Sequence, residues 1–148
     1  MPIDKHGYCY LIKEYTYARR KKEVTLPGGS LDRNETPLKA AKRELIEETG
    51  LRSDKWHYLG KVYYFSNIFN TPEHLFLALN VTKNDKSVRH KNGIHIKEDD
   101  AIVIRIPFSR LVKMALSGKL DSAERCTAVF RAHHYLQSKK YDFKTGRN

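Results

Sequence analysis

Short apolar runs along the chain predict a series of β-strands. The run from Tyr8 to Ile12 is bounded by Gly7 and by charged residues, as is typical of a buried strand. Pro27, Gly28 and Gly29 interrupt the next such run, and two glycines in succession allow the main chain to approach a ligand closely. The pattern predicts strands over Tyr8–Ile12, Glu23–Leu26, Trp56–Phe65, His74–Val81 and Ala101–Ile106.

A helix is predicted between the second and third of these strands. Thr36 is suited to the N-cap position, and Pro37 to the first helical position, where its missing N–H costs nothing. The helix is expected to run to Thr49 and to end at Gly50. Its apolar stripe, formed by Leu38, Ala41 and Leu45, is expected to pack on a sheet.

The C-terminal third adds two helices, Phe108–Leu116 and Ser122–Gln137, separated by Gly118. The long charged stretch Lys83–Asp100 has no periodicity, and segments of this kind are either mobile or functional. We therefore predict one α/β domain over residues 1–138, with a mixed sheet between helices. Residues 139–148 form a basic segment with little to pack, which we expect to be a flexible tail.

Composition narrows the class of protein. The 148 residues are 40% hydrophobic, and no apolar run approaches the ~20 residues that span a membrane. The first residues lack the apolar core of a signal peptide, and Cys9 and Cys126 match no metal-ligand spacing. We interpret them as isolated buried thiols of a cytoplasmic protein.

The formal net charge is +11 at pH 7. Such a charge can attract nucleic acid or steer anionic nucleotides to a site. Part of it lies in the run from Arg19 to Lys22 and part in the C-terminal tail, where solvated loops are the simpler interpretation.

Three carboxylates of the first predicted helix carry the strongest chemical signal. Glu44, Glu47 and Glu48 are spaced i, i+3 and i+4, so they project from one helical face, where like charges repel. A cation that requires oxygen ligands explains why such a cluster is retained. Mg²⁺ and Mn²⁺ fit this ligand set, and phosphate chemistry is their usual function.

The stretch from Gly29 to Leu51 resembles the Nudix box, G-x5-E-x7-R-E-U-x-E-E-x-G-U, where U is aliphatic. All nine fixed positions match: Gly29, Glu35, Arg43, Glu44, Leu45, Glu47, Glu48, Gly50 and Leu51. The resemblance implies a Nudix-type α/β/α sandwich. It also implies metal-dependent hydrolysis of a nucleoside diphosphate linked to a further group, with water attacking phosphorus.

Residue roles follow from this resemblance. The metal ligands would be Glu44 and Glu48, with Glu47 sharing the cluster and the Gly28 carbonyl completing the set. Arg43 would orient one of the glutamates. Glu35 would brace the loop against the start of the helix, although an exposed loop glutamate is the competing interpretation.

Weaker similarities extend along the chain to the ADP-ribose pyrophosphatases. They are Leu11–Tyr15, His74–Ala78, Glu98–Asp100 and Gly118–Ser122. The third resembles an acidic loop that supplies a catalytic carboxylate, for which Asp99 is the first candidate. Thr16 stands where that group has an arginine, and the N-terminal extension that builds a swapped dimer is absent, so a homodimer is left open.

The remaining candidates concern the substrate. Tyr15 and Tyr17 either stack on an adenine or pack against the fold. Arg19 can replace the missing arginine if its loop folds back, and Glu73, before the fourth strand, is a further binding candidate.

The sequence favours hydrolysis of ADP-ribose or a nucleotide sugar. The alternatives are hydrolysis of dinucleotides such as NADH or diadenosine polyphosphates, hydrolysis of RNA 5′ ends, and a non-catalytic nucleotide-sensing module. The expected partner is a small nucleotide, with RNA possible but not favoured and no membrane.

Overall fold

The alternating segments of the chain form a mixed sheet covered by helices on both faces. The computed structural model describes residues 1–63, 70–84, 101–120 and 122–143. Its elements are β1 (Pro2–Ile3), β2 (Tyr8–Thr16), the 3₁₀ turn η1 (Tyr17–Arg19), β3 (Lys21–Thr25), α1 (Pro37–Thr49), β4 (Leu51–Arg52), β5 (Lys55–Tyr63), β6 (Pro72–Leu79), β7 (Thr82–Lys83), β8 (Ile102–Pro107), α2 (Phe108–Leu116) and α3 (Ala123–Ser138).

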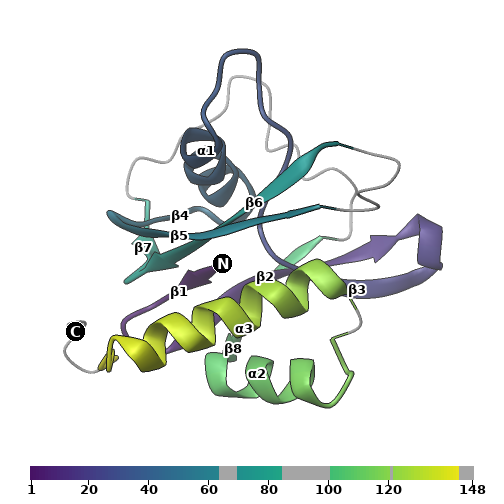
Figure 1. The fold of residues 1–148 in the computed structure, drawn as a ribbon. Helices are drawn as coiled ribbons and strands as arrows, with labels where there is room; N and C mark the ends of the chain where they lie inside the picture. The colour runs from purple at the N-terminus through teal and green to yellow at the C-terminus, as the bar shows by residue number, and fades with distance from the viewer. Residues whose placement is uncertain (64–69, 85–100, 121, 144–148) are drawn as a thin grey trace.

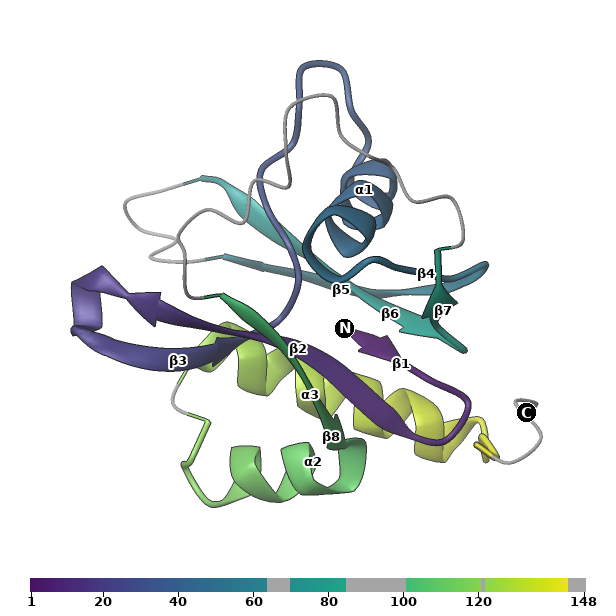
Figure 2. The ribbon, with the colours of Figure 1, turned by 180° about the vertical axis from the view of Figure 1, so that it is seen from behind.

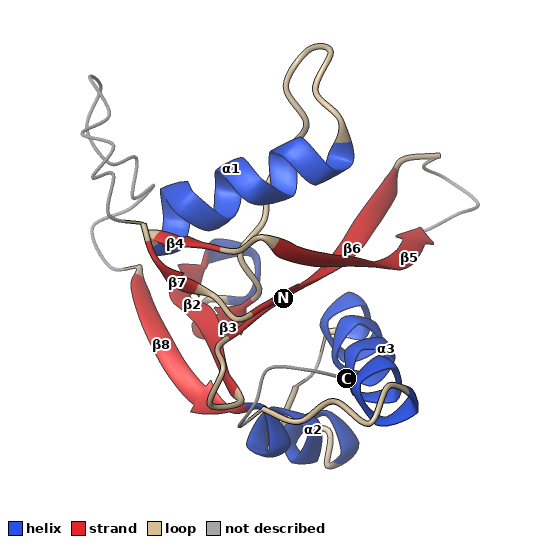
Figure 3. Ribbon diagram, turned by 90° about the vertical axis from the view of Figure 1, so that its left-hand side faces the viewer, coloured by secondary structure: helices blue, strands red, loops and turns tan. Residues whose placement is uncertain are grey.

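The main sheet has the order β3-β2-β1-β6-β5, and β8 also pairs with β2. Among the strand pairs formed by the described residues, β1 and β6 run parallel and the others antiparallel. β4 and β7 form a separate two-stranded sheet after α1. Helix α1 lies on one side of the sheet, whereas α2 and α3 lie on the other (Figures 1 and 2), and the layers are seen edge-on in Figure 3. The expected α/β/α sandwich with a mixed sheet is confirmed.

Local signals at the ends of α1 place this helix where the sequence predicts it. The hydroxyl of Thr36 accepts a hydrogen bond from the Lys39 N–H, and Pro37 is the first helical residue. Gly50 closes the helix with a φ of 66°, a left-handed conformation that glycine adopts without strain. The predicted apolar stripe is partly wrong, because Leu38 is 37% exposed and Ala40 is buried in its place beside Leu45.

Strand boundaries differ more from prediction. The basic run is not simply a loop, since Lys21 and Lys22 belong to β3, while Tyr17–Arg19 form η1. The strands of two residues, β1, β4 and β7, have no signal in the local pattern. β4 pairs with β7 and β1 pairs with β6, partners that are distant in sequence, although β1 also pairs with the nearby β2.

Two apolar clusters lie on opposite faces of the sheet. The larger includes Cys9 and Leu11 of β2 and residues of α2 and α3 such as Leu111 and Val129. The smaller consists of Leu45, Leu51, Ala78 and Val81, with Tyr10 and Trp56 packed against it. Because side chains alternate along a strand, the even-numbered residues of β2 face α1 and the odd-numbered residues face α2 and α3.

The segment after α3 packs against the domain as far as Phe143. Tyr141 and Phe143 pack against the larger cluster, and the Tyr141 hydroxyl donates a hydrogen bond of 2.9 Å to Asn80. These two aromatic residues therefore correct the expectation of a tail with little to pack, and residues 144–148 lie outside the described part.

The thiols of Cys9 and Cys126 both pack or form hydrogen bonds within the fold. Burial raises the pKa of the Cys9 thiol to about 12, and the half-buried Cys126 thiol donates to the Leu120 carbonyl at 2.9 Å. None of the helices formed by the described residues is long and apolar enough to cross a membrane.

Candidate active site

Arg43 of α1 donates hydrogen bonds to two carboxylates of the helix and to Glu35 of the preceding loop. One Arg43 nitrogen, Nη1, donates to Glu44 at 2.7 Å and to Glu47 at 3.0 Å. The Nε and Nη2 groups donate to the two oxygens of Glu35 at 3.2 and 3.0 Å. These hydrogen bonds raise the pKa of Arg43 above its ordinary value, the largest contribution coming from Glu35. The guanidinium thus carries a fixed positive charge among three carboxylates.

The same arginine ties the loop before α1 to the helix. Arg43 Nη2 donates to the Ser30 carbonyl at 3.0 Å, and the Asp32 N–H donates to Glu35 at 3.1 Å. The hydrogen bond from Arg43 is the main cause that lowers the pKa of Glu35. The contacts of Glu35 agree with the bracing role and not with a merely exposed glutamate.

Glu48 contacts a different part of the loop. Its Oε2 accepts a hydrogen bond of 2.9 Å from the Gly28 N–H. Desolvation of the carboxyl group, followed by repulsion from Glu44, Glu14 and Glu47, raises the pKa of Glu48 to about 7, although the Gly28 hydrogen bond opposes this shift. A divalent cation would supply the positive charge that this carboxylate lacks.

Gly29 lies against the Glu44 carboxylate, which a side chain at position 29 would displace. An ideal Cβ on Gly29 would lie 2.3 Å from Oε1 of Glu44, whereas one on Gly28 would meet no atom within 4 Å. The loop therefore approaches the Glu44 carboxylate as closely as a glycine permits.

These residues supply the donors that a hard cation requires, namely carboxylates and main-chain carbonyls. Among the described residues no three acidic, histidine or cysteine side chains are drawn together in metal-binding geometry, and Arg43 instead lies against Glu44 and Glu47. By the chemistry of its donors, the set of Glu44, Glu47, Glu48 and the Gly28 carbonyl fits Mg²⁺ or Mn²⁺.

Glu14 is a further carboxylate of the site, which the sequence analysis included in the similar segment Leu11–Tyr15 without naming it as a site residue. It lies in β2 on the side that faces α1, and it accepts a hydrogen bond of 3.3 Å from Thr25, three residues before Gly28. Its charge contributes to the raised pKa of Glu48. The segment Leu11–Tyr15 contains Glu14, but strand alternation assigns Glu14 to the site only once the face of β2 toward α1 is known.

The predicted substrate residues are not all brought together. Tyr15 lies on the opposite face of β2 from Glu14, and its ring meets that of Tyr17 edge-on at 5.1 Å. Tyr17 is 69% exposed, and Arg19 is paired with Glu23 at 2.7 Å. Glu73, in contrast, lines a pocket next to the loop. Asp99 and the rest of the acidic loop lie outside the described residues.

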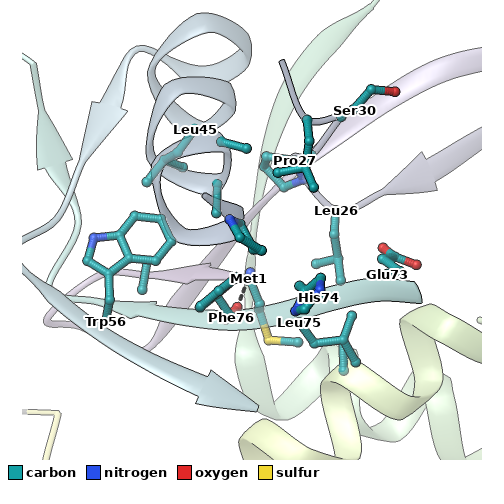
Figure 4. Close-up of a pocket in the computed structure, with 18 of the residues that line it drawn as sticks. Met1, Leu26, Pro27, Ser30, Leu45, Trp56, Glu73, His74, Leu75 and Phe76 are labelled. Carbon is teal, nitrogen blue, oxygen red and sulfur yellow. Dashed lines mark hydrogen bonds between the residues drawn. The ribbon is translucent and has the colours of Figure 1, made fainter. Parts of the chain in front are cut away.

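That pocket lies between α1 and the paired strands β5 and β6 and has a volume of about 770 Å³. Its walls include Ala41 and Leu45 of α1 and the loop residues Gly28 and Gly29. Figure 4 shows Trp56 at one end and Glu73 and Ser30 at the other, with Phe76 and His74 along the strand between them. The pocket therefore has an aromatic end and a polar end beside the loop.

Comparison with known proteins places the chain in a family. The NUDIX domain model matches residues 2–121. An ADP-ribose pyrophosphatase of Bacillus subtilis (strain 168) is 25% identical over 141 residues, which cover 95% of this chain and 71% of that protein. An RNA pyrophosphohydrolase of Bartonella bacilliformis is 49% identical over 47 residues, covering 32% of this chain and 28% of the relative.

A solved structure described as "Crystal structure of ADP compounds hydrolase" superimposes with a TM-score of 0.77 at 21% identity. The match covers 93% of this chain and 70% of that one, and at this identity it shows the fold. The similarity is therefore not limited to Gly29–Leu51 but extends over most of the domain. The chain belongs to the NUDIX domain family.

Proposed function

We propose that the protein hydrolyses the diphosphate bond of a nucleoside diphosphate linked to another group, and that it requires Mg²⁺ or Mn²⁺. ADP-ribose or a nucleotide sugar is the proposed substrate, giving a nucleoside monophosphate and a phosphorylated product. The observation that carries the proposal is the single-faced carboxylate cluster of α1, held against the Gly28–Gly29 loop by the contacts of Glu48 and Glu44.

Each residue of the cluster has a distinct task in this proposal. Glu44 and Glu48, with Glu47 and the Gly28 carbonyl, would hold the cation, which neutralises the diphosphate and lowers the pKa of the attacking water. Arg43 is a positioning residue, because its hydrogen bonds fix Glu35, Glu44 and Glu47. Glu35 in turn fixes the loop through the Asp32 N–H.

The proton acceptor is proposed to be a carboxylate of the acidic loop, with Asp99 preferred over Glu98 and Asp100. The cluster glutamates are committed to the cation, so attack by water requires a further acceptor. Substitution of the right residue by its amide should lower turnover on the order of 10²-fold. Three nearly neutral variants would assign this task to Glu47.

The relative named an ADP-ribose pyrophosphatase, which matches 95% of this chain, supports an adenosine diphosphate compound as substrate. A screen of ADP-ribose, ADP-glucose, NADH and diadenosine polyphosphates for Mg²⁺-dependent turnover tests both the reaction and its range. Glu48→Gln should nearly abolish turnover while the circular dichroism spectrum stays unchanged. Full turnover in EDTA, or wild-type rates in a folded Glu48→Gln protein, would contradict the metal-dependent mechanism.

Hydrolysis of RNA 5′ ends is a second candidate, favoured by the net charge of +11. Binding through phosphate contacts weakens steeply as salt rises. Activity on 5′-triphosphate RNA that falls steeply with salt, together with no activity on ADP-ribose, would favour RNA. Sedimentation of the purified protein would determine whether it forms a homodimer.

A further inference from the structure

We propose that the pocket between α1 and β5–β6 binds the nucleobase of the substrate, with Trp56 and Phe76 as its aromatic contacts. This inference rests on the proposed function, because it assigns a place to one end of the nucleotide. It differs from the expectation that Tyr15 and Tyr17 stack on the base.

The pocket continues directly into the carboxylate site. Ala40 and Ala41 of α1 line it, and on a helical wheel Glu44 and Glu48 project between these two alanines. Gly28 and Gly29 border both regions, since Gly28 also contacts Glu48 and Gly29 abuts Glu44. A diphosphate held at the carboxylates therefore leaves the attached nucleoside at the mouth of this pocket.

The lining differs along the pocket. The Trp56 and Phe76 rings meet edge-on with their centroids 6.3 Å apart, and Leu45 and Ala41 add apolar surface from α1. Aromatic and aliphatic walls suit a planar base, whose faces gain stacking contacts there. A volume of about 770 Å³ is in the range of small-molecule sites.

The other end of the pocket is polar and lies at the loop. Glu73 and Ser30 are on this side, opposite Trp56 (Figure 4). A carboxylate and a hydroxyl can accept hydrogen bonds from ribose hydroxyls, which an apolar wall cannot. In this proposal the base lies against Phe76 and Trp56, the ribose extends toward Glu73 and Ser30 beside the loop, and the phosphates lie at the α1 cluster.

Tyr15 and Tyr17 lack this continuity. Tyr15 projects from the face of β2 opposite Glu14, and neither tyrosine lines the pocket. Their edge-on contact at 5.1 Å is a packing arrangement between neighbours in sequence.

Trp56 is the only tryptophan of the 148 residues, so its fluorescence reports directly on the pocket. We would titrate the wild-type protein with AMP, adenosine and ribose 5-phosphate in the presence of Mg²⁺. AMP and adenosine should change the Trp56 emission, and ribose 5-phosphate, which lacks the base, should not. An unchanged emission at saturating AMP would overturn the proposal.

Variants test the same contact by calorimetry. Phe76→Leu should weaken AMP binding roughly tenfold, which is the loss expected for one stacking contact. Ala41→Leu adds volume to the pocket without removing an aromatic ring and should weaken AMP binding by a similar factor. Phe130→Leu makes the same chemical change at an exposed phenylalanine of α3 and should leave the affinity unchanged. The melting temperature of each variant verifies the fold.

The outcomes separate this proposal from the proposed reaction. Turnover of ADP-ribose with no effect of Phe76→Leu or Ala41→Leu on KM would leave the reaction intact and overturn the base pocket. Loss of AMP affinity in Tyr17→Ser but not in Phe76→Leu would also overturn it. AMP binding that responds to both pocket variants, in a protein that hydrolyses none of the compounds, would support the pocket and contradict the reaction.

Discussion

The main-chain N–H of Gly28 donates a hydrogen bond of 2.9 Å to Glu48 Oε2, which joins the loop after β3 to the last turn of α1. This single bond fixes a helix carboxylate against the main chain of the loop. It also lies where three other carboxylates, Glu44, Glu14 and Glu47, oppose ionisation of Glu48.

The first prediction concerns the stability of the metal-free protein. The folded pKa of Glu48, about 7, lies above the ordinary value of 4.5, so the folded state binds the proton more tightly than the unfolded state. Stability is therefore expected to fall as pH rises from 4.5 to 7 and to level off above 7. The melting temperature in EDTA should show this decline, and Glu48→Gln should reduce it.

The matched control is Asp54→Asn, which removes an exposed carboxylate elsewhere. Its melting temperature should follow the wild-type pH dependence. Added Mg²⁺ should reverse the trend in the wild type, because a cation binds the ionised cluster and competes with protons. Identical pH profiles for wild type and Glu48→Gln in EDTA would show that Glu48 ionises normally.

A second prediction compares two adjacent glycines. In Gly29→Ala the new Cβ would meet Glu44 Oε1 at 2.3 Å, so the end of a flexible side chain must move while the fold persists. We expect weaker Mg²⁺ binding and roughly tenfold lower turnover, as one misplaced ligand would cause. Gly28→Ala, which meets nothing within 4 Å and keeps its carbonyl, should have a much smaller effect. Equal losses in both variants would mean that the Glu44 carboxylate is not the sensitive group.

A third prediction assigns Glu14 to the same electrostatic unit. Glu14→Gln removes a negative charge that opposes ionisation of Glu48, so the pKa of Glu48 should decrease and the metal-free protein should become more stable near pH 7. If Glu14 also helps to hold the cation, the affinity of the Glu14→Gln protein for Mg²⁺ should fall at the same time. Calorimetric titration and thermal unfolding measure the two effects separately. Tyr15→Phe, on the opposite face of β2, is the control for a change in this strand.

The sequence predicted those parts of the molecule that depend on neighbours along the chain. The cap residues Thr36, Pro37 and Gly50 act within a turn of α1, and its ends were predicted correctly. Glu44, Glu47 and Glu48 share a face because of helical geometry alone. Arg43 and Glu35 were recognised from the motif.

What the sequence did not predict depends on register between distant segments. The pairing of Glu14 with Glu23 across β2 and β3 determines which side chains face α1, and it is fixed only when β1 and β8 also pair with β2. The pocket likewise brings Trp56, Phe76 and Leu45 together from β5, β6 and α1. Tyr15 and Tyr17 were candidates to contact the base because they lie next to a recognised motif. No motif lies next to Trp56, so the sequence did not indicate it.

The last prediction concerns Arg19, a candidate to replace the arginine missing at Thr16 if its loop folds back over the site. Its Nη1 instead lies 2.7 Å from Oε1 of Glu23, whose side chain is only 5% exposed, and Lys21 is the second cation at 3.5 Å. Arg19→Ala should therefore cost about 1–3 kcal/mol of stability, because a buried carboxylate loses its closer partner. The kcat/KM for ADP-ribose should change little. Combining Arg19→Ala with Glu23→Gln should restore most of the melting temperature, as expected for coupled residues.

Thr16→Arg tests the original position, since residue 16 lies on the α1 face of β2 and an arginine there could form paired hydrogen bonds with a phosphate. We expect it to raise kcat/KM for ADP-ribose relative to NADH. A stable Arg19→Ala protein with greatly reduced kcat/KM would instead show that Arg19 reaches the substrate and that its contact with Glu23 is secondary.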